Sequence, residues 1–281
     1  MPHLNDQALQ DMNKESYFDL VIESTPEPLQ TLTEWATRSK LGMLFIEFRP
    51  MDTIKYNLWN IANVYGGGDT ALTIVHSGEN KELIMETTKD WKNVKYIQAF
   101  ENNRDVNVYS KLLTSYEFWN TFSEFEYILI NQWDSYIFKK IPEEFFEYDF
   151  VGAPTGHYYI QHDGRIINIC SSMCKCDRCV AGDHPYRENN FIKHPNKIFM
   201  FNGGFSLRNV STMKDMCRAK PWSGEAEDLY FMISTISRPT RDVGRSFSVQ
   251  DFRCEGIPVG CHQIWLSQDE EYIRNLFKKM K

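Results

Sequence analysis

The sequence predicts an α/β protein with a mostly parallel β-sheet that helices cover on both faces. The first observation is that short apolar runs alternate with segments of helical spacing between residues 43 and 130. Strands that are joined in this way by helices run parallel in one sheet. The second observation is length, because a chain of 281 residues can remove about 75% of its unfolded surface from water. The core therefore needs no disulfide or metal.

Each predicted element follows from a local pattern. The apolar runs that predict strands lie at residues 43–48, 71–76, 94–99 and 127–130. The segments that predict helices lie at residues 52–65, 79–88 and 105–122, and three glycines at 66–68 end the first of them. A sheet of this kind binds its ligands beyond the carboxyl ends of the strands.

The rest of the chain divides around this alternation. We predict an N-terminal extension over residues 1–42, with a strand at 17–22 and a helix at 29–40, and a main domain over residues 43–281. Residues 156–197 are polar, contain four of the seven cysteines and lack clear periodicity, so they predict a Cys-rich insertion. Beyond it the predicted elements are a strand at 198–201 and helices at 211–218 and 226–236.

Composition excludes some classes of partner. The net charge is −7 and Lys and Arg form no long block, so nucleic acid is not an expected partner. The N-terminus has neither a basic nor an apolar signal region, and no apolar run approaches the length of a membrane-spanning helix. We expect a soluble, cytoplasmic protein with no transmembrane segment.

Four patches could carry chemistry, and each has a structural alternative. Asp134 follows an apolar strand, where it could hold a divalent metal or cap the next turn. Gly203 and Gly204 permit close approach of a ligand or form a bulge. Glu227 and Asp228 start a predicted helix, as a proton acceptor or as partners of its dipole. His262 is a structural side chain or a metal ligand.

The order of these patches resembles the common motifs of GT-A-fold glycosyltransferases. More specifically, the chain resembles a domain-of-unknown-function family of glycosyltransferase-like proteins. The resemblance extends from about Met43 to Trp265. It rests on residues 109–119, 132–135, 148–154, 202–208 and 227–231, of which 148–154 and 202–208 are the most specific.

This resemblance implies a GT-A-like, Rossmann-type fold and a hexosyl- or pentosyltransferase that uses a UDP- or GDP-sugar and a glycan or protein acceptor. It implies Asp134 and His262 as ligands of Mn²⁺ or Mg²⁺ and Asp228, beside Glu227, as the base of an inverting reaction. Donor contacts would come from Glu47, Arg49, His76, Gln132, Asp134, Asn202, Gly203 and Gly204.

One departure from the family pattern concerns the metal. The usual Asp-x-Asp is Gln132-Trp133-Asp134 in this chain, so the first carboxylate is missing, although Gln132 could bond a ribose hydroxyl. A catalytically inactive sugar-nucleotide or glycan binder of the same fold is therefore the alternative. A nucleotidyltransferase is a third hypothesis, but residues 49–53 lack the glycine-rich loop with phosphate-binding basic residues that such an enzyme would need.

The cysteines of the predicted insertion have three interpretations. The spacing of Cys176 and Cys179 is that of a zinc knuckle, but the second knuckle of a two-knuckle site is absent. Free thiols or two disulfides are the alternatives. The zinc ligands in question are Cys170, Cys174, Cys176, Cys179 and His184, with His162 nearby.

Overall fold

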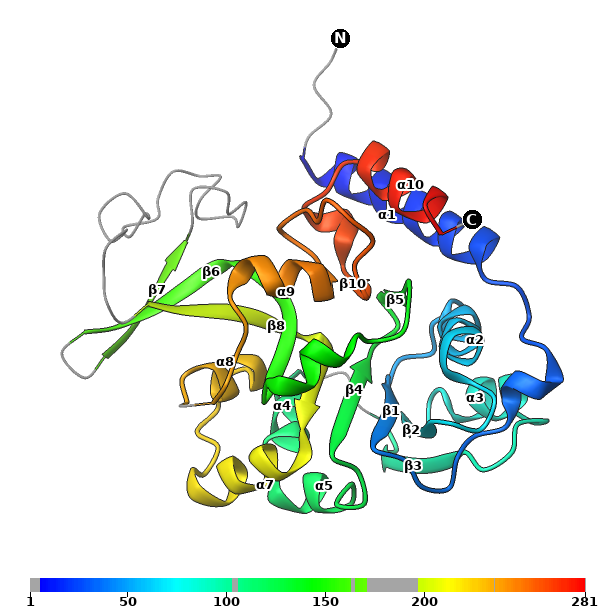
Figure 1. The fold of residues 1–281 in the computed structure, drawn as a ribbon, viewed down its shortest axis with the longest axis horizontal. Helices are drawn as coiled ribbons and strands as arrows, with labels where there is room; N and C mark the ends of the chain where they lie inside the picture. Colours follow the sequence, from blue (N-terminus) through cyan, green and yellow to red (C-terminus); the bar gives the residue numbers. More distant parts are fainter. Residues whose placement is uncertain (1–5, 103–105, 163–164, 171–196, 235, 281) are drawn as a thin grey trace, which may run out of the picture.

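The computed structural model describes residues 6–102, 106–162, 165–170, 197–234 and 236–280. It confirms the α/β class (Figure 1). A seven-stranded sheet has the order β3-β2-β1-β4-β8-β6-β7. The first four strands are parallel, as predicted, and the last three are antiparallel. The strands of this sheet are β1 (Leu41–Ile46), β2 (Ala71–Ser77), β3 (Lys95–Phe100), β4 (Tyr127–Asn131), β6 (Phe150–His162), β7 (Arg165–Cys170) and β8 (Lys197–Asn209).

Helices cover both faces of the parallel half because its strands are apolar on both sides. Met43 and Phe45 face one core cluster, whereas Leu44 and Ile46 face the other. On the first face lie α2 (Ile54–Tyr65) and α3 (Lys81–Thr87). On the second lie α4 (Val106–Leu113), α5 (Tyr116–Asn120), α7 (Val210–Ala219) and α8 (Glu227–Met232).

A second, three-stranded sheet lies at the carboxyl end of the parallel strands. Its order is β5-β10-β9, from β5 (Ser135–Ile137), β10 (Gly260–His262) and β9 (Ser248–Val249). The helix α9 (Arg241–Phe247) leads into it. The 3₁₀ turn η4 (Ile264–Leu266) and helix α10 (Glu270–Lys278) follow it. This sheet was not predicted, since its strands have only two or three residues.

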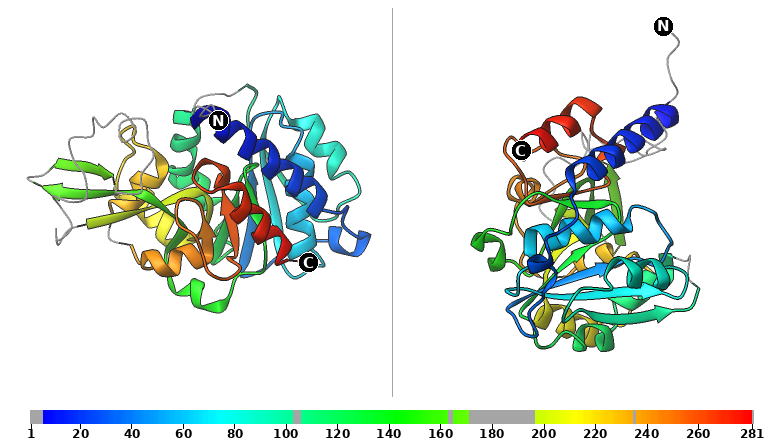
Figure 2. Two further views of the ribbon diagram at one scale, coloured as in Figure 1. Left: turned by 90° about the horizontal axis from the view of Figure 1, so that it is seen from above. Right: turned by 90° about the vertical axis from the view of Figure 1, so that its right-hand side faces the viewer.

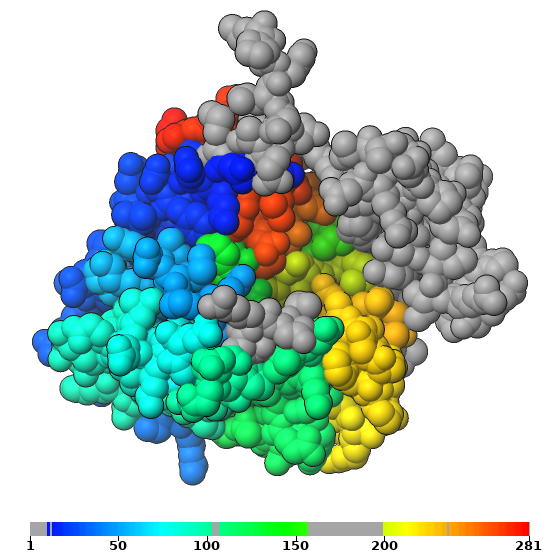
Figure 3. Space-filling view, turned by 180° about the vertical axis from the view of Figure 1, so that it is seen from behind, coloured from blue at the N-terminus to red at the C-terminus, as the bar shows by residue number. Residues whose placement is uncertain are grey.

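The N-terminal extension differs from the prediction. Residues 17–22, predicted as a strand, lie in the helix α1 (Asp6–Ser24). Tyr17 and Val21 are buried one turn apart against Trp265 and Phe277, so packing on the C-terminal segment decides the conformation. Figures 1 and 2 show α1 beside α10, and the space-filling view shows the blue N-terminal segment next to the orange and red C-terminal one (Figure 3).

The predicted helix at 29–40 is also wrong. Only the 3₁₀ turn η1 (Gln30–Thr33) forms there. The backbone N–H groups of Trp35 and Ala36 donate instead to the carbonyls of Lys92 and Thr70, so neighbouring segments replace the intrahelical bonds. A second 3₁₀ turn, η2 (Glu143–Glu147), precedes β6.

The predicted insertion is regular where the structure describes it. Residues 156–162 and 165–170 belong to β6 and β7, which pair as an antiparallel hairpin at the edge of the main sheet. The lack of periodicity was therefore misleading here. None of the described helices is both long and apolar enough to cross a membrane.

Candidate active site

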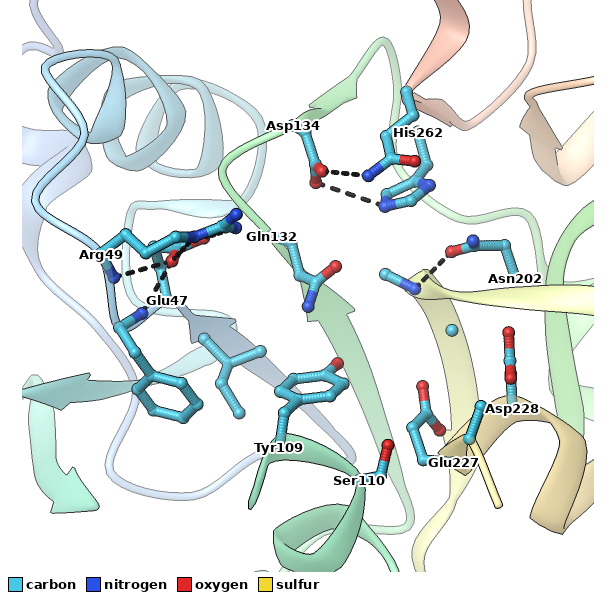
Figure 4. A pocket seen from close by; sticks show the side chains of 16 residues that line it. Glu47, Arg49, Tyr109, Ser110, Gln132, Asp134, Asn202, Glu227, Asp228 and His262 are labelled. Carbon is cyan, nitrogen blue, oxygen red and sulfur yellow. Dashed lines mark hydrogen bonds and ion pairs between the residues drawn. The ribbon is translucent and has the colours of Figure 1, made fainter. Parts of the chain in front are cut away.

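A pocket of about 320 Å³ lies beyond the carboxyl ends of β1 and β4, between them and β8, α8 and β10 (Figure 4). It brings together every residue that the sequence analysis assigned to the donor, the metal or the base, except His76. These residues are Glu47, Arg49, Gln132, Asp134, Asn202, Gly203, Gly204, Glu227, Asp228 and His262.

Asp134 and His262 meet because of the small sheet. In its antiparallel pairing, His262 of β10 lies opposite Ser135, the residue that follows Asp134. The backbone N–H of Gln263 donates to the carbonyl of Asp134 at 3.0 Å, and its side-chain amide donates to Asp134 Oδ2 at 2.7 Å. A few backbone and side-chain hydrogen bonds thus bring together two residues that lie 128 positions apart in the chain.

The carboxylate of Asp134 is buried but remains the favoured form. Burial by itself would raise the pKa of the Asp134 carboxyl. Burial is the largest single influence on this pKa, but interaction with a protonated His262, a hydrogen bond from Gln263 and the charge of Arg49 together outweigh it, so the pKa of Asp134 lies below its ordinary value. The lowered pKa favours the ionised carboxylate of Asp134 in the pocket.

The facing atoms of Asp134 and His262 suit a cation. Oδ1 of Asp134 and Nε2 of His262 lie 3.3 Å apart, and both are buried without a hydrogen bond of good geometry. Two adjacent ligands of an octahedral ion at about 2.1 Å lie about 3 Å apart, so the pair fits a divalent metal that completes its shell with phosphate and water. Among the described residues no group of three His, Cys, Asp or Glu side chains could hold a metal.

Neighbouring side chains approach Gly203 and Gly204 so closely that neither position has room for a Cβ. A Cβ on Gly203 would overlap with the Glu227 carboxylate, and one on Gly204 would overlap with the His262 ring and the Gln132 amide. Both glycines lie in β8, where the pairing with β6 shifts register between Gly152 and its successor. The predicted bulge is therefore present, and protein side chains approach both glycines closely.

The variant Gly204→Ala should displace His262 from Asp134 and destabilise the fold. We expect a loss of about 1–3 kcal/mol in the free energy of unfolding, because overpacking forces buried groups apart. Urea unfolding measures it. Gly256→Ala is the matched control, since a Cβ there meets no atom within 4 Å, and an equal unfolding midpoint for the two variants would contradict the prediction.

Glu227 is not a free carboxylate. Its two oxygens accept from Arg208 Nη1 at 2.8 Å and Nη2 at 3.1 Å, and both side chains are buried. The Arg208 guanidinium also donates to Ser206 Oγ and the Gly203 carbonyl, and it lies over the ring of Phe150. This arrangement ties α8 to the glycine pair and supports a structural role for Glu227.

Asp228 faces the pocket with a raised pKa. It is partly buried, and its Oδ1 accepts only from the backbone N–H of Leu229, at 2.7 Å, among the hydrogen bonds of the described residues. Burial, followed by the charge of Glu227, raises the pKa of Asp228 to about 6. A carboxylate with this pKa is a stronger base than an ordinary aspartate and is still ionised at pH 7.

The other end of the pocket is built by residues that follow β1. Glu47 is buried, and its carboxylate accepts from the backbone N–H and the guanidinium of Arg49, each at 2.8 Å. Arg49 lies over the ring of Trp133 and is about half exposed. His76 does not line the pocket; its Nδ1 contacts the carbonyl of Ser77 at 2.9 Å.

Tyr109 and Gln263 are pocket residues that the sequence analysis did not assign to a site. Tyr109 lies in the helix predicted at residues 105–122, and its hydroxyl points into the pocket (Figure 4) and has no hydrogen-bond partner among the described residues. Burial raises the pKa of Tyr109 well above its ordinary value. Its hydroxyl is therefore a neutral donor that a ligand would satisfy.

Two of the four carboxylates in the pocket are neutralised by an arginine, and among the described residues the other two are not. Arg49 neutralises Glu47, and Arg208 neutralises Glu227. Within the described part of the chain, Asp134 and Asp228 have no Lys or Arg ion-pair partner. An anionic ligand would be repelled by both carboxylates, and His262 is the ion-pair partner of Asp134 when its ring is protonated.

The predicted zinc site is not tested. Cys170 is the last residue of β7, and the remaining candidate ligands, Cys174, Cys176, Cys179 and His184, lie outside the described residues. The three remaining cysteines are unpaired: Cys217, Cys254 and Cys261.

Comparisons with known proteins give a family and a distant structural likeness. No curated protein matches the chain. Two crystal structures of the glycosyltransferase GlyE from Streptococcus pneumoniae TIGR4 are similar, the apo form with 11% identity and a TM-score of 0.38 and a second with 10% and 0.40. They cover 85% and 86% of this chain, which spans 64% of the length of either structure.

The model of the family "Protein of unknown function (DUF5672)" matches residues 93–262. This match covers more than half of the 281 residues, and the chain therefore belongs to the DUF5672 family.

Proposed function

We propose that this protein is a glycosyltransferase that moves a sugar from a nucleotide-sugar donor to an acceptor hydroxyl. One observation carries the proposal: Asp134, the glycine pair, Asp228 and His262 surround a single pocket beyond the carboxyl ends of parallel strands. This is where α/β sheets bind nucleotides. In the pocket, Asp134 and His262, which would hold a metal, lie apart from Asp228, whose pKa is raised. Sugar transfer needs both kinds of group.

Asp134 and His262 are the residues that would hold Mn²⁺ or Mg²⁺. Their facing atoms lack hydrogen-bond partners, and the carboxylate is ionised because its pKa is lowered. A divalent ion there supplies positive charge next to the diphosphate that leaves. Gln263 holds the second oxygen of Asp134 and fixes the orientation of the carboxylate.

Asp228 is the proposed base. In an inverting reaction, the acceptor hydroxyl gives its proton to Asp228 as its oxygen bonds to the anomeric carbon, and the diphosphate oxygen leaves with the electron pair of the broken glycosidic bond. The oxygens of Glu227 are occupied by Arg208, so Glu227 would support the reaction only through its charge, which raises the pKa of Asp228. Both are attached to the short helix α8.

Donor contacts would come from the other end of the pocket. The Glu47–Arg49 pair and Gln132 offer hydrogen bonds to the base and ribose, and the Asn202 amide oxygen holds the backbone N–H of Gly204 at 2.7 Å. The glycine pair would allow the sugar to lie against the main chain. His76 has no place in this proposal.

A catalytically inactive sugar-nucleotide binder is the second candidate. Gln132 in place of a first carboxylate favours it, since the described residues offer only Asp134 and His262 to a metal. Such a protein would bind a nucleotide in the same pocket without turnover.

The test measures release of nucleoside diphosphate from UDP- and GDP-sugars with Mn²⁺ or with EDTA. We expect turnover only with Mn²⁺, and a loss of at least about 100-fold in Asp134→Asn, because the carboxylate is one of two protein ligands. Asp69→Asn, at an exposed position, is the matched control. Mn²⁺-dependent nucleotide binding without turnover in any form would favour the binder, and no binding at all would exclude both candidates.

A further inference from the structure

The imidazole of His262 has a buried partner on the side away from the pocket. Nδ1 of His262 lies 3.0 Å from Oε1 of Gln250, and both side chains are buried or nearly so. Nε2 of the same ring lines the pocket and lies 3.3 Å from Oδ1 of Asp134. The orientation of this ring thus depends on a residue that does not line the pocket.

Gln250 is itself held by a polar network that is buried except at Arg253. Its backbone carbonyl accepts from Gln268 Nε2 at 2.7 Å. Oε1 of Gln268 accepts from Arg253 Nε at 2.9 Å, and because a guanidinium only donates, this bond determines which end of the Gln268 amide faces Gln250. The Gln268 carbonyl accepts from Asn13 of α1 at 3.3 Å. The network therefore runs from the N-terminal helix to the pocket.

The contact between Gln250 and His262 has a consequence for the proton of the ring. An amide oxygen can only accept, so whenever the imidazole is neutral its single proton lies on Nδ1. Nε2 then carries a lone pair, and this lone pair and the Asp134 carboxylate point toward the same part of the pocket. Neither atom has a hydrogen bond among the described residues. Two acceptors that face each other in this way are stabilised by a cation between them.

We propose that Gln250 is a positioning residue that holds His262 in the tautomer with its proton on Nδ1, so that Nε2 is available to a divalent metal beside Asp134. This inference rests on the proposed function, since the metal belongs to that proposal. It adds a residue that acts through His262 and touches neither donor nor acceptor. An acceptor bonded to the far nitrogen of a metal-binding imidazole raises metal affinity because it fixes both the tautomer and the angle of the ring.

The first measurement is Mn²⁺ binding to the full chain without nucleotide, by electron paramagnetic resonance or calorimetry. Gln250→Leu should weaken binding by about 10- to 100-fold, because the acceptor for Nδ1–H is lost. Gln250→Glu keeps an acceptor and should bind within about threefold of wild type. Gln98→Leu, at an exposed glutamine, is the matched control. Thermal unfolding establishes that each variant is folded.

The second measurement separates this inference from the proposed function. In metal-free protein at pH 8, ¹⁵N resonances of His262, assigned by their loss in His262→Gln, report which ring nitrogen carries the proton. We expect the Nδ1–H form in wild type and Gln250→Glu, and a mixture of forms in Gln250→Leu. An Nε2–H form or an imidazolium in wild type would overturn the inference, as would unchanged Mn²⁺ affinity in folded Gln250→Leu. If wild type binds no Mn²⁺ but shows the Nδ1–H form, the tautomer assignment stands and the metal proposal fails.

Discussion

In the Asp228→Asn variant, we expect the rate of sugar transfer to fall by about 10²- to 10⁴-fold, which is the range that a positioned general base contributes. Asparagine has nearly the same shape but cannot accept the acceptor proton. The measurement is kcat with the donor identified by the turnover assay, compared with Asp215→Asn, in which an exposed aspartate is changed. A variant that retains most of the wild-type rate would remove Asp228 from the mechanism.

The pH dependence of the wild type follows from the same residue. Asp228 has to be ionised to accept a proton, and its pKa is raised to about 6 by burial and by Glu227. The rate should therefore be constant above about pH 7 and fall as the pH drops through 6. An ordinary aspartate would give this fall near pH 4. The pH at which the rate falls therefore tests whether burial and Glu227 raise the pKa of Asp228.

The stability of Asp228→Asn distinguishes loss of a base from loss of the fold. A raised pKa means that the folded protein binds the proton more tightly than the unfolded chain does. The carboxylate therefore destabilises the fold fully above about pH 6, and this cost disappears below about pH 4. We expect Asp228→Asn to melt at a higher temperature than wild type at pH 7.5 and at the same temperature at pH 4. A lower melting temperature at pH 7.5 would contradict this.

The Arg208→Met variant should lose about 3–5 kcal/mol of folding free energy, because it leaves the buried Glu227 carboxylate without its cation. The Arg208 side chain is fully buried and donates to Glu227, Ser206 and the Gly203 carbonyl. Its removal therefore leaves several acceptors unsatisfied in addition to the charge. Denaturant unfolding, with the midpoint and slope fitted separately, measures the loss.

Two further variants show that the pair acts as a unit. Arg208→Met combined with Glu227→Leu should recover most of the lost stability, since no buried charge remains. Arg218→Met is the matched control, because its pair with Asp215 is exposed and such pairs contribute about 0–1 kcal/mol. A loss below about 1 kcal/mol in Arg208→Met would contradict the view that α8 is held to the glycine pair by this contact.

The parallel half of the fold could be predicted because its signals are local. Apolar runs such as residues 127–130 must be buried on both faces, and the helical spacing from Ile54 to Tyr65 needs a core on one side only. The N-terminal segment was predicted wrongly because its pattern is ambiguous over a few residues. The local pattern around Tyr17 and Val21 is compatible with a strand. In the structure the two residues lie one helical turn apart and pack on the C-terminal segment.

The resemblance to glycosyltransferases implied most of the assigned residues that gather beyond the carboxyl ends of the strands, whereas the sequence alone determined the α/β class and the approximate place of the parallel strands. It did so because hydrophobic period and chemically distinctive residues are readable without coordinates. Only the tertiary structure decided which carboxylate is free: Glu227 is paired with Arg208, whereas Asp228 is not. It also placed His262 opposite Ser135 and behind it Gln250. The contacts of His262 join residues far apart in the chain through strands of two or three residues, whose pairing energy depends on the assembled core rather than on any local pattern.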